Sequence, residues 1–451
     1  MITSQAFAGK RYAVLGLARS GLSAVESLLA SGAHVMAWDN RNEPREAVEG
    51  RVELADPVSA DITGYEAVVV SPGVPLNSHP IAEAAAKAGV PVIGDIELFA
   101  RARADLPAHR VVGITGTNGK STTTSLVAHL LRSAAVPVSV GGNIGVPILS
   151  QKPLGPGGVY VLELSSYQID LTQSLDCDVA ALLNITPDHL DRYGTFEAYA
   201  ASKARLFDML GPGHVAVFGT GDDETAGIAH GQLQRSDLKA CVVADGADLA
   251  HLQPGWPSLQ GPHNLQNAAV SVAIASSLGL TASQWERALP TFRGLPHRME
   301  RVAEAGGVLF INDSKATNPA SAAPALAAFP PSLGPSGTKP RIHWILGGLP
   351  KGDNLDECKP FFGNVAAAYT IGDAGPLFAE ILAPYTSVNR SEMMAEAVRE
   401  AMAAARSGDV VMLSPACASF DQFRDFEARG DQFRQIVEAL LEEQTSDEEA
   451  G

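Results

Sequence analysis

The feature that most constrains the fold of this chain is a glycine-rich loop between a buried strand and a helix. Residues 110–114 are an apolar run, and residues 122–132 have the periodicity of a helix. The loop between them reads Gly116-Thr117-Asn118-Gly119-Lys120-Ser121. Glycine lets the backbone wrap around a phosphate, the start of the helix presents N–H groups, and Lys120 adds positive charge. We therefore predict an ATP-binding loop, with Ser121 on Mg²⁺, although Ile114 stands where the general motif has glycine.

A second glycine-rich turn follows the first predicted strand, residues 12–16. It runs from Gly16 to Gly21 and lacks the middle glycine of the dinucleotide fingerprint, because Ala18 stands there. Asp39 ends the next strand, where folds of this kind place a polar group on a sugar or base. The turn predicts phosphate binding at the start of the helix that follows it. For Asp39, the alternative is a carboxylate at a strand end that only faces solvent.

Strands and helices alternate along the whole chain, which indicates parallel sheets. With 451 residues the chain is longer than one hydrophobic core usually serves. We predict an α/β fold of three consecutive domains: residues 1–104, 105–295 and 296–451. The first and last are Rossmann-like and flank a P-loop ATPase-like domain. Residues 101–107 read as a linker, residues 330–340 as a surface loop, and the acidic tail 442–451 as disordered.

Composition limits the possible partners and location. The net charge of −17 argues against a broad nucleic-acid-binding face. The four cysteines form no C-x-x-C pair, so we expect neither a disulfide framework nor a zinc site. No signal peptide or apolar stretch of spanning length is visible. We expect a cytoplasmic monomer without stable membrane insertion.

Several unusual strings occur in one order along nearly the whole chain. Besides the ATP loop with Thr122 they are Gly142-Asn143-Ile144-Gly145, Glu163-Leu164-Ser165-Ser166-Tyr167-Gln168, Asn184-Ile185-Thr186-Pro187-Asp188-His189-Leu190-Asp191-Arg192, Gly261-Pro262-His263-Asn264-Leu265-Gln266-Asn267, Pro296-His297-Arg298-Met299-Glu300, Asn312-Asp313-Ser314-Lys315-Ala316-Thr317-Asn318, and residues 413–423. Together they resemble the Mur ligase family.

The resemblance implies an ATP-dependent ligase of peptidoglycan precursor synthesis. A substrate carboxylate attacks the γ-phosphate of ATP, and an amine then attacks the resulting acyl phosphate. The string at residues 413–423 and the short first domain favour D-glutamate as the acceptor and UDP-N-acetylmuramoyl-L-alanine as the substrate. The resemblance also implies two Mg²⁺ sites and a carbamylated lysine, Lys203, which otherwise reads as a solvated helix residue.

The resemblance assigns the site residues in five groups. The catalytic residues are Lys120, His189 and Lys203, and the metal ligands are Ser121, Glu163, His189 and carbamylated Lys203. ATP contacts are Gly116, Thr117, Asn118, Gly119, Lys120, Ser121, Thr122, Asn264, Asn267, Arg298 and Asp313. Contacts to the UDP-substrate are Arg19, Ser20, Asp39, Asn40, Ser71, Pro72, Gly73, Asn143, Gln168 and His189. D-glutamate contacts are Lys315, Thr317, Lys351, Ser419 and Phe426.

Three alternatives stay open on the sequence. A sibling ligase or a folylpolyglutamate synthetase would share the central domain and take another acceptor. A non-enzymatic, nucleotide-gated binding module would tolerate loss of Glu163, His189 or Lys203, all of which are present. A nicotinamide dehydrogenase conflicts with the broken glycine fingerprint and with the ATP loop.

Overall fold

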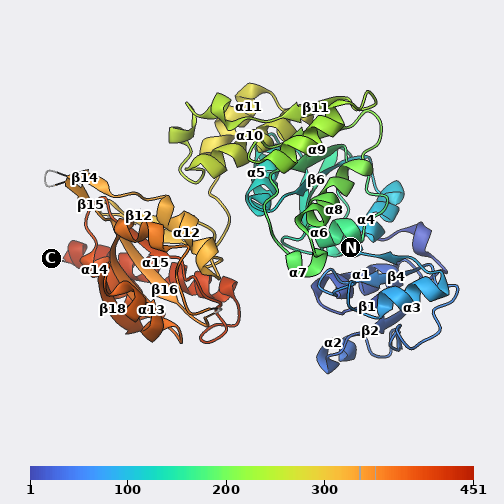
Figure 1. Ribbon diagram of the computed structural model, residues 1–451, viewed down its shortest axis with the longest axis horizontal. Helices are drawn as coiled ribbons and strands as arrows, with labels where there is room; N and C mark the ends of the chain where they lie inside the picture. Colours follow the sequence, from blue (N-terminus) through green and yellow to red (C-terminus); the bar gives the residue numbers. More distant parts are fainter. Residues whose placement is uncertain (335–336, 351, 451) are drawn as a thin grey trace. The chain divides into compact units, whose positions relative to one another are not determined.

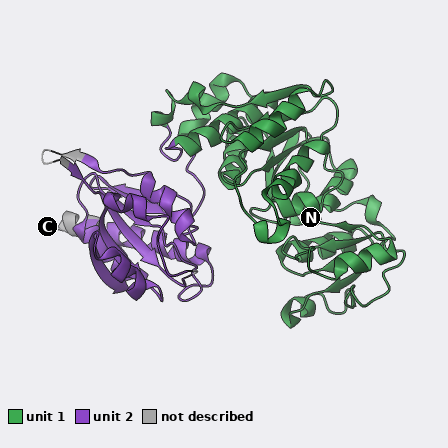
Figure 2. Ribbon diagram, in the orientation of Figure 1, with its two compact units in different colours: residues 1–255, 262–291 green, residues 256–261, 292–451 purple. Residues whose placement is uncertain are grey.

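The computed structural model describes residues 1–334, 337–350 and 352–450 and divides into two compact units. Unit 1 comprises residues 1–255 and 262–291, and unit 2 comprises residues 256–261 and 292–451 (Figure 2). Three large sheets are present, as the sequence predicts, and the first two belong to unit 1. The boundaries at residues 104 and 295 stay a prediction.

The first sheet is parallel and has the order β3-β2-β1-β4-β5. Its strands are β1 (Arg11–Leu15), β2 (His34–Trp38), β3 (Glu53–Leu54), β4 (Ala67–Val70) and β5 (Val92–Ile93). Its helices are α1 (Arg19–Ala30), α2 (Asn42–Glu46), α3 (Ile81–Ala88) and α4 (Asp95–Ala102) (Figure 1). The glycine-rich turn after β1 therefore lies beside the loop after β4 at the carboxyl edge.

The second sheet is also parallel, in the order β11-β10-β9-β6-β8-β7. Its strands are β6 (His109–Thr115), β7 (Val138–Gly142), β8 (Gly158–Glu163), β9 (Val179–Leu182), β10 (Val215–Phe218) and β11 (Ala240–Val243). Its helices are α5 (Lys120–Ser133), α6 (Ser166–Asp170), α7 (Leu190–Tyr193), α8 (Phe196–Asp208), α9 (Asp223–Leu233), α10 (Pro262–Ser277) and α11 (Ala282–Ala288). Since β6 lies between β9 and β8, the ATP loop begins between the ends of these two strands.

The third sheet forms the centre of unit 2 and has the order β12-β13-β19-β16-β17-β18, with only β12 antiparallel. Its strands are β12 (Glu300–Ala305), β13 (Val308–Asn312), β16 (Ile342–Gly347), β17 (Val365–Ile371), β18 (Ser387–Glu392) and β19 (Val410–Leu413). Its helices are α12 (Pro319–Ala327), α13 (Gly375–Leu382), α14 (Met394–Ala404) and α15 (Phe426–Ala450). Short 3₁₀ turns span Gln5–Phe7, Arg103–Asp105, Ile148–Ser150, Gly246–Leu249, Gln253–Gly255, Leu289–Thr291 and Lys359–Asn364.

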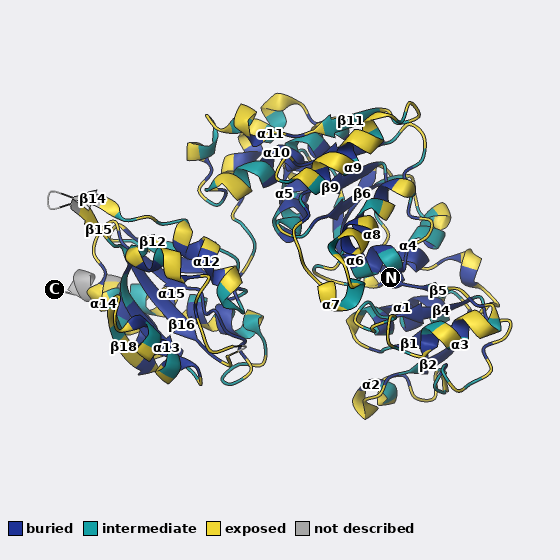
Figure 3. Ribbon diagram, viewed as in Figure 1, coloured by how far each residue is buried: buried dark blue, intermediate teal, exposed yellow. Residues whose placement is uncertain are grey.

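One apolar core joins the first two sheets. Tyr12 and Val14 from β1 belong to the same buried cluster as Val111 from β6 and Leu162 from β8. Phe99 of α4 also lies in this cluster and its ring meets that of Tyr160 edge-on, with centroids 5.1 Å apart. Burial of this shared apolar surface is the main force that holds the two sheets in one unit. Figure 3 shows central strands such as β9 and β16 as buried, and the outer helix faces as exposed.

Two expectations about connecting segments need correction. Residues 101–107 are not a loose linker, because α4 continues to Ala102 and Arg103 donates to the carbonyl of Asp176. Within residues 330–340, β14 (Ser332–Gly334) pairs antiparallel with β15 (Gly337–Lys339) instead of forming a plain loop. The bounds of α15 extend to Ala450, and the disorder expected for residues 442–451 stays a prediction.

The helices of the described residues include none that is long and apolar enough to cross a membrane.

Candidate active site

The loop after β6 has the backbone shape of a phosphate-binding loop. Gly116 has φ +152° and Gly119 has φ +82°, which are conformations that favour glycine. Asn184 holds the outside of the loop: its carbonyl accepts from Thr117 N at 2.8 Å, and its Oδ1 accepts from Asn118 N at 2.9 Å. Gly119 then leads directly into α5 and gives that helix no side-chain cap. The first turn of α5 is therefore built to present N–H groups to an anion.

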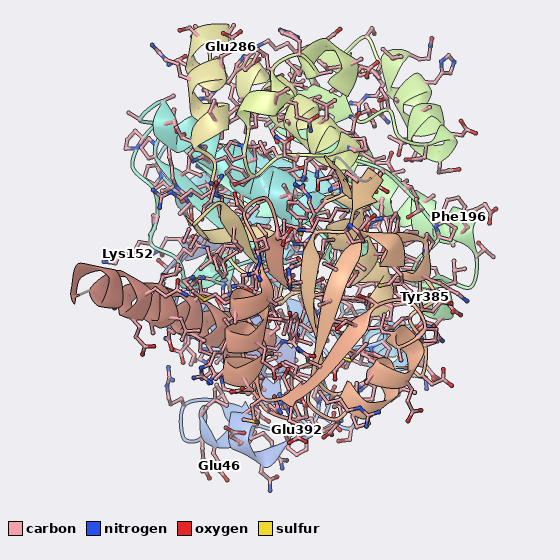
Figure 4. All side chains as sticks on the ribbon, turned by 90° about the vertical axis from the view of Figure 1, so that its left-hand side faces the viewer. Glu46, Lys152, Phe196, Glu286, Tyr385 and Glu392 are labelled. Carbon is pink, nitrogen blue, oxygen red and sulfur yellow. The ribbon has the colours of Figure 1, made fainter. Side chains whose placement is uncertain are left out.

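Two lysines converge on this loop from different elements. Lys120 Nζ donates to the carbonyls of Gly116 and Thr117, each at 2.8 Å. Lys203 Nζ donates to the same Gly116 carbonyl at 2.9 Å from α8, the helix that begins at Phe196 (labelled in Figure 4). Lys203 is 1% exposed, so it is not the solvated helix residue that the pattern alone suggests. Burial, and then the charge of Lys120, lower the pKa of Lys203 to about 7, against the opposing effect of Asp188 and Asp170.

A buried carboxylate ends the neighbouring strand β8. Glu163 Oε1 accepts from Asn143 Nδ2 at 3.0 Å. Its Oε2 is buried and has no hydrogen-bond partner among the described residues. A buried carboxylate oxygen without a partner is costly unless a cation or another donor reaches it. Ser121 is buried in the first turn of α5, and Thr122 follows it.

His189 is not buried with Glu163 and Ser121 and lies at the start of α7. It has φ +52°, its side chain is 45% exposed, and its Nε2 is 3.6 Å from Asp188 Oδ2. Its ring lies between two tyrosines, with centroids 5.0 Å from Tyr167 and 6.0 Å from Tyr199. Lys203 Nζ is 4.6 Å from the centroid of the same Tyr199 ring. Tyr199 is therefore a common neighbour of His189 and Lys203.

Asn264 and Asn267 lie on the first turns of α10. Asn267 Nδ2 donates to Asn264 Oδ1 at 3.4 Å, and Asn267 is buried. A Cβ added at Gly119 would lie 2.3 Å from Asn267 Oδ1. The helix that follows the second sheet thus packs directly against the ATP loop, and Gly119 is required for that approach.

The predicted UDP-substrate residues of the first sheet gather at its carboxyl edge, and two of them organise the backbone. Asp39 Oδ2 accepts from Leu17 N at 2.8 Å and Oδ1 from Arg41 N at 3.0 Å. Although burial acts to raise the pKa of Asp39, these hydrogen bonds lower it below its ordinary value. Ser71 Oγ donates to the Gly16 carbonyl at 2.8 Å. The remaining predicted residues are Arg19 and Ser20 at the start of α1, the exposed Asn40, and Pro72 and Gly73 after β4.

Gln168 is less accessible than a substrate contact would be. It is buried, and its Oε1 accepts from Ser165 N at 3.2 Å, which closes the capping box of α6. The nearby carboxyl of Asp95 is buried too, and burial raises its pKa to about 6. Gln168 therefore has a structural task at the start of α6, and its contact to substrate stays a prediction.

In unit 2 the predicted residues lie around the ends of β13 and β19. Asp313 Oδ2 accepts from Ser414 Oγ at 2.7 Å and its Oδ1 from Met299 N at 3.1 Å. Burial raises the pKa of Asp313 to about 7, while Ser414, Met299 and the charge of Arg298 act in the opposite direction. Arg298 Nε is buried without a hydrogen-bond partner among the described residues. This N–H donor is therefore available for a hydrogen bond to an acceptor atom of a ligand.

The predicted acceptor site is formed by the loops after the same strands. Lys315 Nζ lies 5.0 Å from the centroid of the Phe426 ring. Thr317 N donates to the Lys315 carbonyl at 2.9 Å, and Ser419 is buried in the loop after β19. Lys351 lies outside the described residues. Lys315 and Phe426 are thus brought together from segments more than a hundred residues apart in the sequence.

Arg429 is the main residue of this region that sequence reasoning missed. It is fully buried on α15, and its guanidinium donates to the carbonyls of Ser314, Cys417 and Ala418 at 2.8, 3.0 and 3.1 Å. It also donates to Ser314 Oγ at 3.0 Å. Burial lowers its pKa to about 10. An arginine inside an apolar helix face was a visible sign, but only the fold shows which loops it holds.

Comparison with known proteins identifies a family over most of the chain. The profile of the Mur ligase MurD-like N-terminal domain matches residues 10–94, that of the Mur ligase middle domain residues 114–253, and that of the Mur ligase glutamate ligase domain residues 297–417. The chain is 69% identical to a UDP-N-acetylmuramoylalanine–D-glutamate ligase of Novosphingobium aromaticivorans, over 98% of both chains. It is 58% identical to the enzyme of the same name from Sphingopyxis alaskensis, over 98% of this chain and 100% of that one.

Solved structures are similar in fold at low sequence identity. A UDP-N-acetylmuramate-alanine ligase of Thermotoga maritima has a TM-score of 0.56 at 16% identity, covering 95% of this chain and 99% of that one. A UDP-N-acetylmuramoylalanyl-D-glutamyl-2,6-diaminopimelate–D-alanyl-D-alanyl ligase of Acinetobacter baumannii also has a TM-score of 0.56 at 16% identity, covering 97% and 92%. These two similarities support the three-sheet α/β fold.

Proposed function

The chain belongs to the Mur ligase family, and from this premise we propose that it joins D-glutamate to UDP-N-acetylmuramoyl-L-alanine while ATP is split into ADP and phosphate. The observation that carries the proposal is the 69% identity, over 98% of both chains, with a relative named for this reaction. In the reaction, an oxygen of the alanyl carboxylate attacks the γ-phosphorus and ADP leaves. The amine of D-glutamate then attacks the acyl carbon, loses a proton and expels phosphate.

The first step brings two anions together, so the site must supply positive charge. Lys120 stands at the start of α5, where its ammonium group can move from the Gly116 and Thr117 carbonyls to the phosphates of ATP. The backbone from Gly116 to Ser121 and the hydroxyl of Thr122 would surround those phosphates. We also assign Asn264, Asn267, Arg298 and Asp313 to the nucleotide.

The residues present also fit Mg²⁺. Glu163 Oε2 is a buried, unpartnered carboxylate oxygen at the end of β8, and Ser121 offers a hydroxyl on α5. The described residues contain no group of three or more His, Cys, Asp or Glu side chains able to hold a metal ion. Phosphate oxygens would therefore complete the ligand set of Ser121 and Glu163, as is usual for Mg²⁺. When bound, Mg²⁺ neutralises phosphate charge as the carboxylate approaches.

A second Mg²⁺ would be held by His189 and by Lys203 as its carbamate. Carbamate formation needs a neutral amine, whose nitrogen attacks the carbon of CO₂ and then releases a proton. The pKa of Lys203, lowered to about 7 by burial and by Lys120, makes the neutral amine available near physiological pH. His189 and Lys203 both contact the ring of Tyr199, which supports their action at one ion.

The two remaining substrates are assigned to separate loops. The carboxyl edge of the first sheet would hold the uridine diphosphate part, and Asn143, Gln168 and His189 the part nearer the reacting carboxylate. In unit 2, Lys315 and Thr317 with Ser419 suit the two carboxylates of D-glutamate, and Phe426 suits its methylene groups. Lys351 would add a further positive charge. We further propose that the enzyme is a monomer and acts in the cytoplasm, where ATP and nucleotide-linked precursors are available.

The test is phosphate release from ATP with Mg²⁺ and UDP-N-acetylmuramoyl-L-alanine. D-glutamate, L-glutamate, L-lysine and meso-diaminopimelate are offered in separate reactions. Release with D-glutamate alone supports the proposal. Release with another of these amino acids would overturn the acceptor assignment and move the enzyme to a sibling step.

A further inference from the structure

Arg192 occupies an unusual place between the two sheets of unit 1. It belongs to α7, the four-residue helix that starts directly after His189, and its backbone N–H donates to the His189 carbonyl at 3.0 Å. The side chain is only partly exposed. A cation in this position sits one helical turn from a predicted catalytic residue, yet nothing in the mechanism above uses it.

The guanidinium of Arg192 touches both sheets at once. Its Cζ lies 3.8 Å from the centroid of the Tyr167 ring, which belongs to the second sheet's layer. Its Nη1 donates to the carbonyl of Pro72, in the loop after β4 of the first sheet, at 3.3 Å. The backbone carbonyl of Arg192 accepts from Asn77 Nδ2 at 3.2 Å, which adds a second link to the same loop. One residue therefore ties the β4 loop to α7.

Tyr167 connects Arg192 to the catalytic region through its ring contacts. Its ring stacks on Tyr193 with centroids 6.0 Å apart and lies 5.0 Å from the His189 ring. His189 itself has a positive φ, which a histidine keeps only where its surroundings hold it. Packing from Arg192 through Tyr167 therefore limits where this imidazole can point, together with the contacts of His189 to Tyr199 and Asp188.

We propose that Arg192 is a positioning residue that sets the spacing between the β4 loop, containing residues 71–73, and His189. The proposal rests on the function proposed above, in which these two segments hold the two halves of the UDP-substrate. A planar guanidinium can stack by its face on Tyr167 and donate by its edge to Pro72, and an ammonium cannot do both. Arg192 would thus act on substrate affinity without touching the reacting atoms.

The experiment compares Arg192→Lys with Arg205→Lys in the full-length enzyme. Arg205 is the matched control, because its Nη1 lies 3.7 Å from Asp170 and it contacts carbonyls of its own sheet layer. For Arg192→Lys we expect KM for the UDP-substrate to rise about tenfold, with kcat within about threefold and KM for ATP and D-glutamate unchanged. Arg205→Lys should leave all four parameters at their wild-type values.

Calorimetric titration of the UDP-substrate into each enzyme, without ATP, supplies a readout besides turnover. The dissociation constant should rise about tenfold for Arg192→Lys alone, in line with loss of a positioning contact. Wild-type affinity in Arg192→Lys, or an equal loss in all substrates and in thermal stability, would overturn the proposal. A wild-type enzyme that neither binds nor converts the UDP-substrate would instead overturn the proposed function, so the two failures are distinguishable.

Discussion

Lys120 and Lys203 donate to the same acceptor, the carbonyl oxygen of Gly116, at 2.8 and 2.9 Å. Two ammonium groups on one oxygen repel each other, and Lys203 is the more buried of the two. The site can lower this repulsion if Lys203 loses its proton or if Lys120 moves to a phosphate. The pair therefore couples the charge state of Lys203 to the position of Lys120.

Carbamylation of Lys203 should follow from this pair. In ¹³C-bicarbonate at pH 8 we expect a protein-bound carbamate signal in the ¹³C NMR spectrum. The signal should weaken as the pH falls through about 7, the pKa of Lys203, because the protonated amine cannot attack CO₂. Lys203→Arg should lack the signal and Lys152→Arg should retain it. A signal of full strength in Lys203→Arg would place the carbamate elsewhere.

Lys120→Ala should abolish ATP-dependent ligation and leave the fold intact, because the lysine contributes charge to the phosphates and only backbone contacts to the loop. We expect a loss of at least about a thousandfold in kcat, as when a preorganised charge is removed from a transition state. Lys152→Ala, at an exposed loop position (Figure 4), is the control. Normal product formation by Lys120→Ala would remove the assignment of the loop.

Gly119→Ala tests how closely α10 packs on the ATP loop. Gly213 has the same φ of +82° but no atom within 4 Å of an added Cβ, whereas a Cβ at Gly119 meets Asn267 Oδ1 at 2.3 Å. Both alanines carry the strain of a left-handed conformation, about 1 kcal/mol. Only Gly119→Ala should raise KM for ATP, by about tenfold or more. Equal kinetics in the two variants would show that the Asn267 contact does not shape the site.

Ser414→Ala should shift the pH dependence of nucleotide use. The Ser414 hydroxyl lowers the pKa of Asp313, which burial raises to about 7, so its removal raises that pKa further. If ATP is bound by the ionised carboxylate, the acid limb of kcat/KM for ATP moves to higher pH, by about one unit for one lost hydrogen bond. The measurement is a profile from pH 5.5 to 9, with Ser407→Ala at the other edge of the sheet as control. An unmoved limb would contradict a role for the Asp313 anion.

Arg429→Met should destabilise unit 2 and weaken D-glutamate binding together. The substitution leaves the carbonyls of Ser314, Cys417 and Ala418 buried without their donor. We expect the free energy of unfolding in urea to fall by about 3 kcal/mol or more, because the substitution removes the donor of a buried hydrogen-bond network. Arg424→Met removes an exposed arginine paired with Asp425 and should change little. A stable Arg429→Met variant with normal KM for D-glutamate would be the contrary result.

The sequence predicts most of the sheets because their strands are apolar and bounded by turn residues. The apolar runs at residues 12–16 and 110–114 fall on β1 and β6. Short or polar edge strands were missed, among them β5 with two residues and β18 with the sequence Ser-Val-Asn-Arg-Ser-Glu. Such strands owe their conformation to a neighbour's hydrogen bonds rather than to their own pattern.

The same distinction applies to the site. Glycines of the ATP loop, such as Gly116, could be placed from local sequence because the motif itself fixes their geometry, whereas Glu163 was assigned by the family resemblance. Asn184 and Arg429 could not, since their tasks are hydrogen bonds to segments far away in the chain. Burial of Lys203 likewise depends on how α8 packs, which periodicity alone does not specify.

Arg429 binds the loops around Ser314 and Cys417, and this has a consequence for protein synthesis. Both loops, around Ser314 and Cys417, are translated before the arginine that fastens them. A nascent chain can therefore complete its nucleotide loop, which needs only residues up to Asn267, while its acceptor loops still lack their common donor. The ability to accept the amino acid therefore requires that α15 has been synthesised and has packed against the sheet.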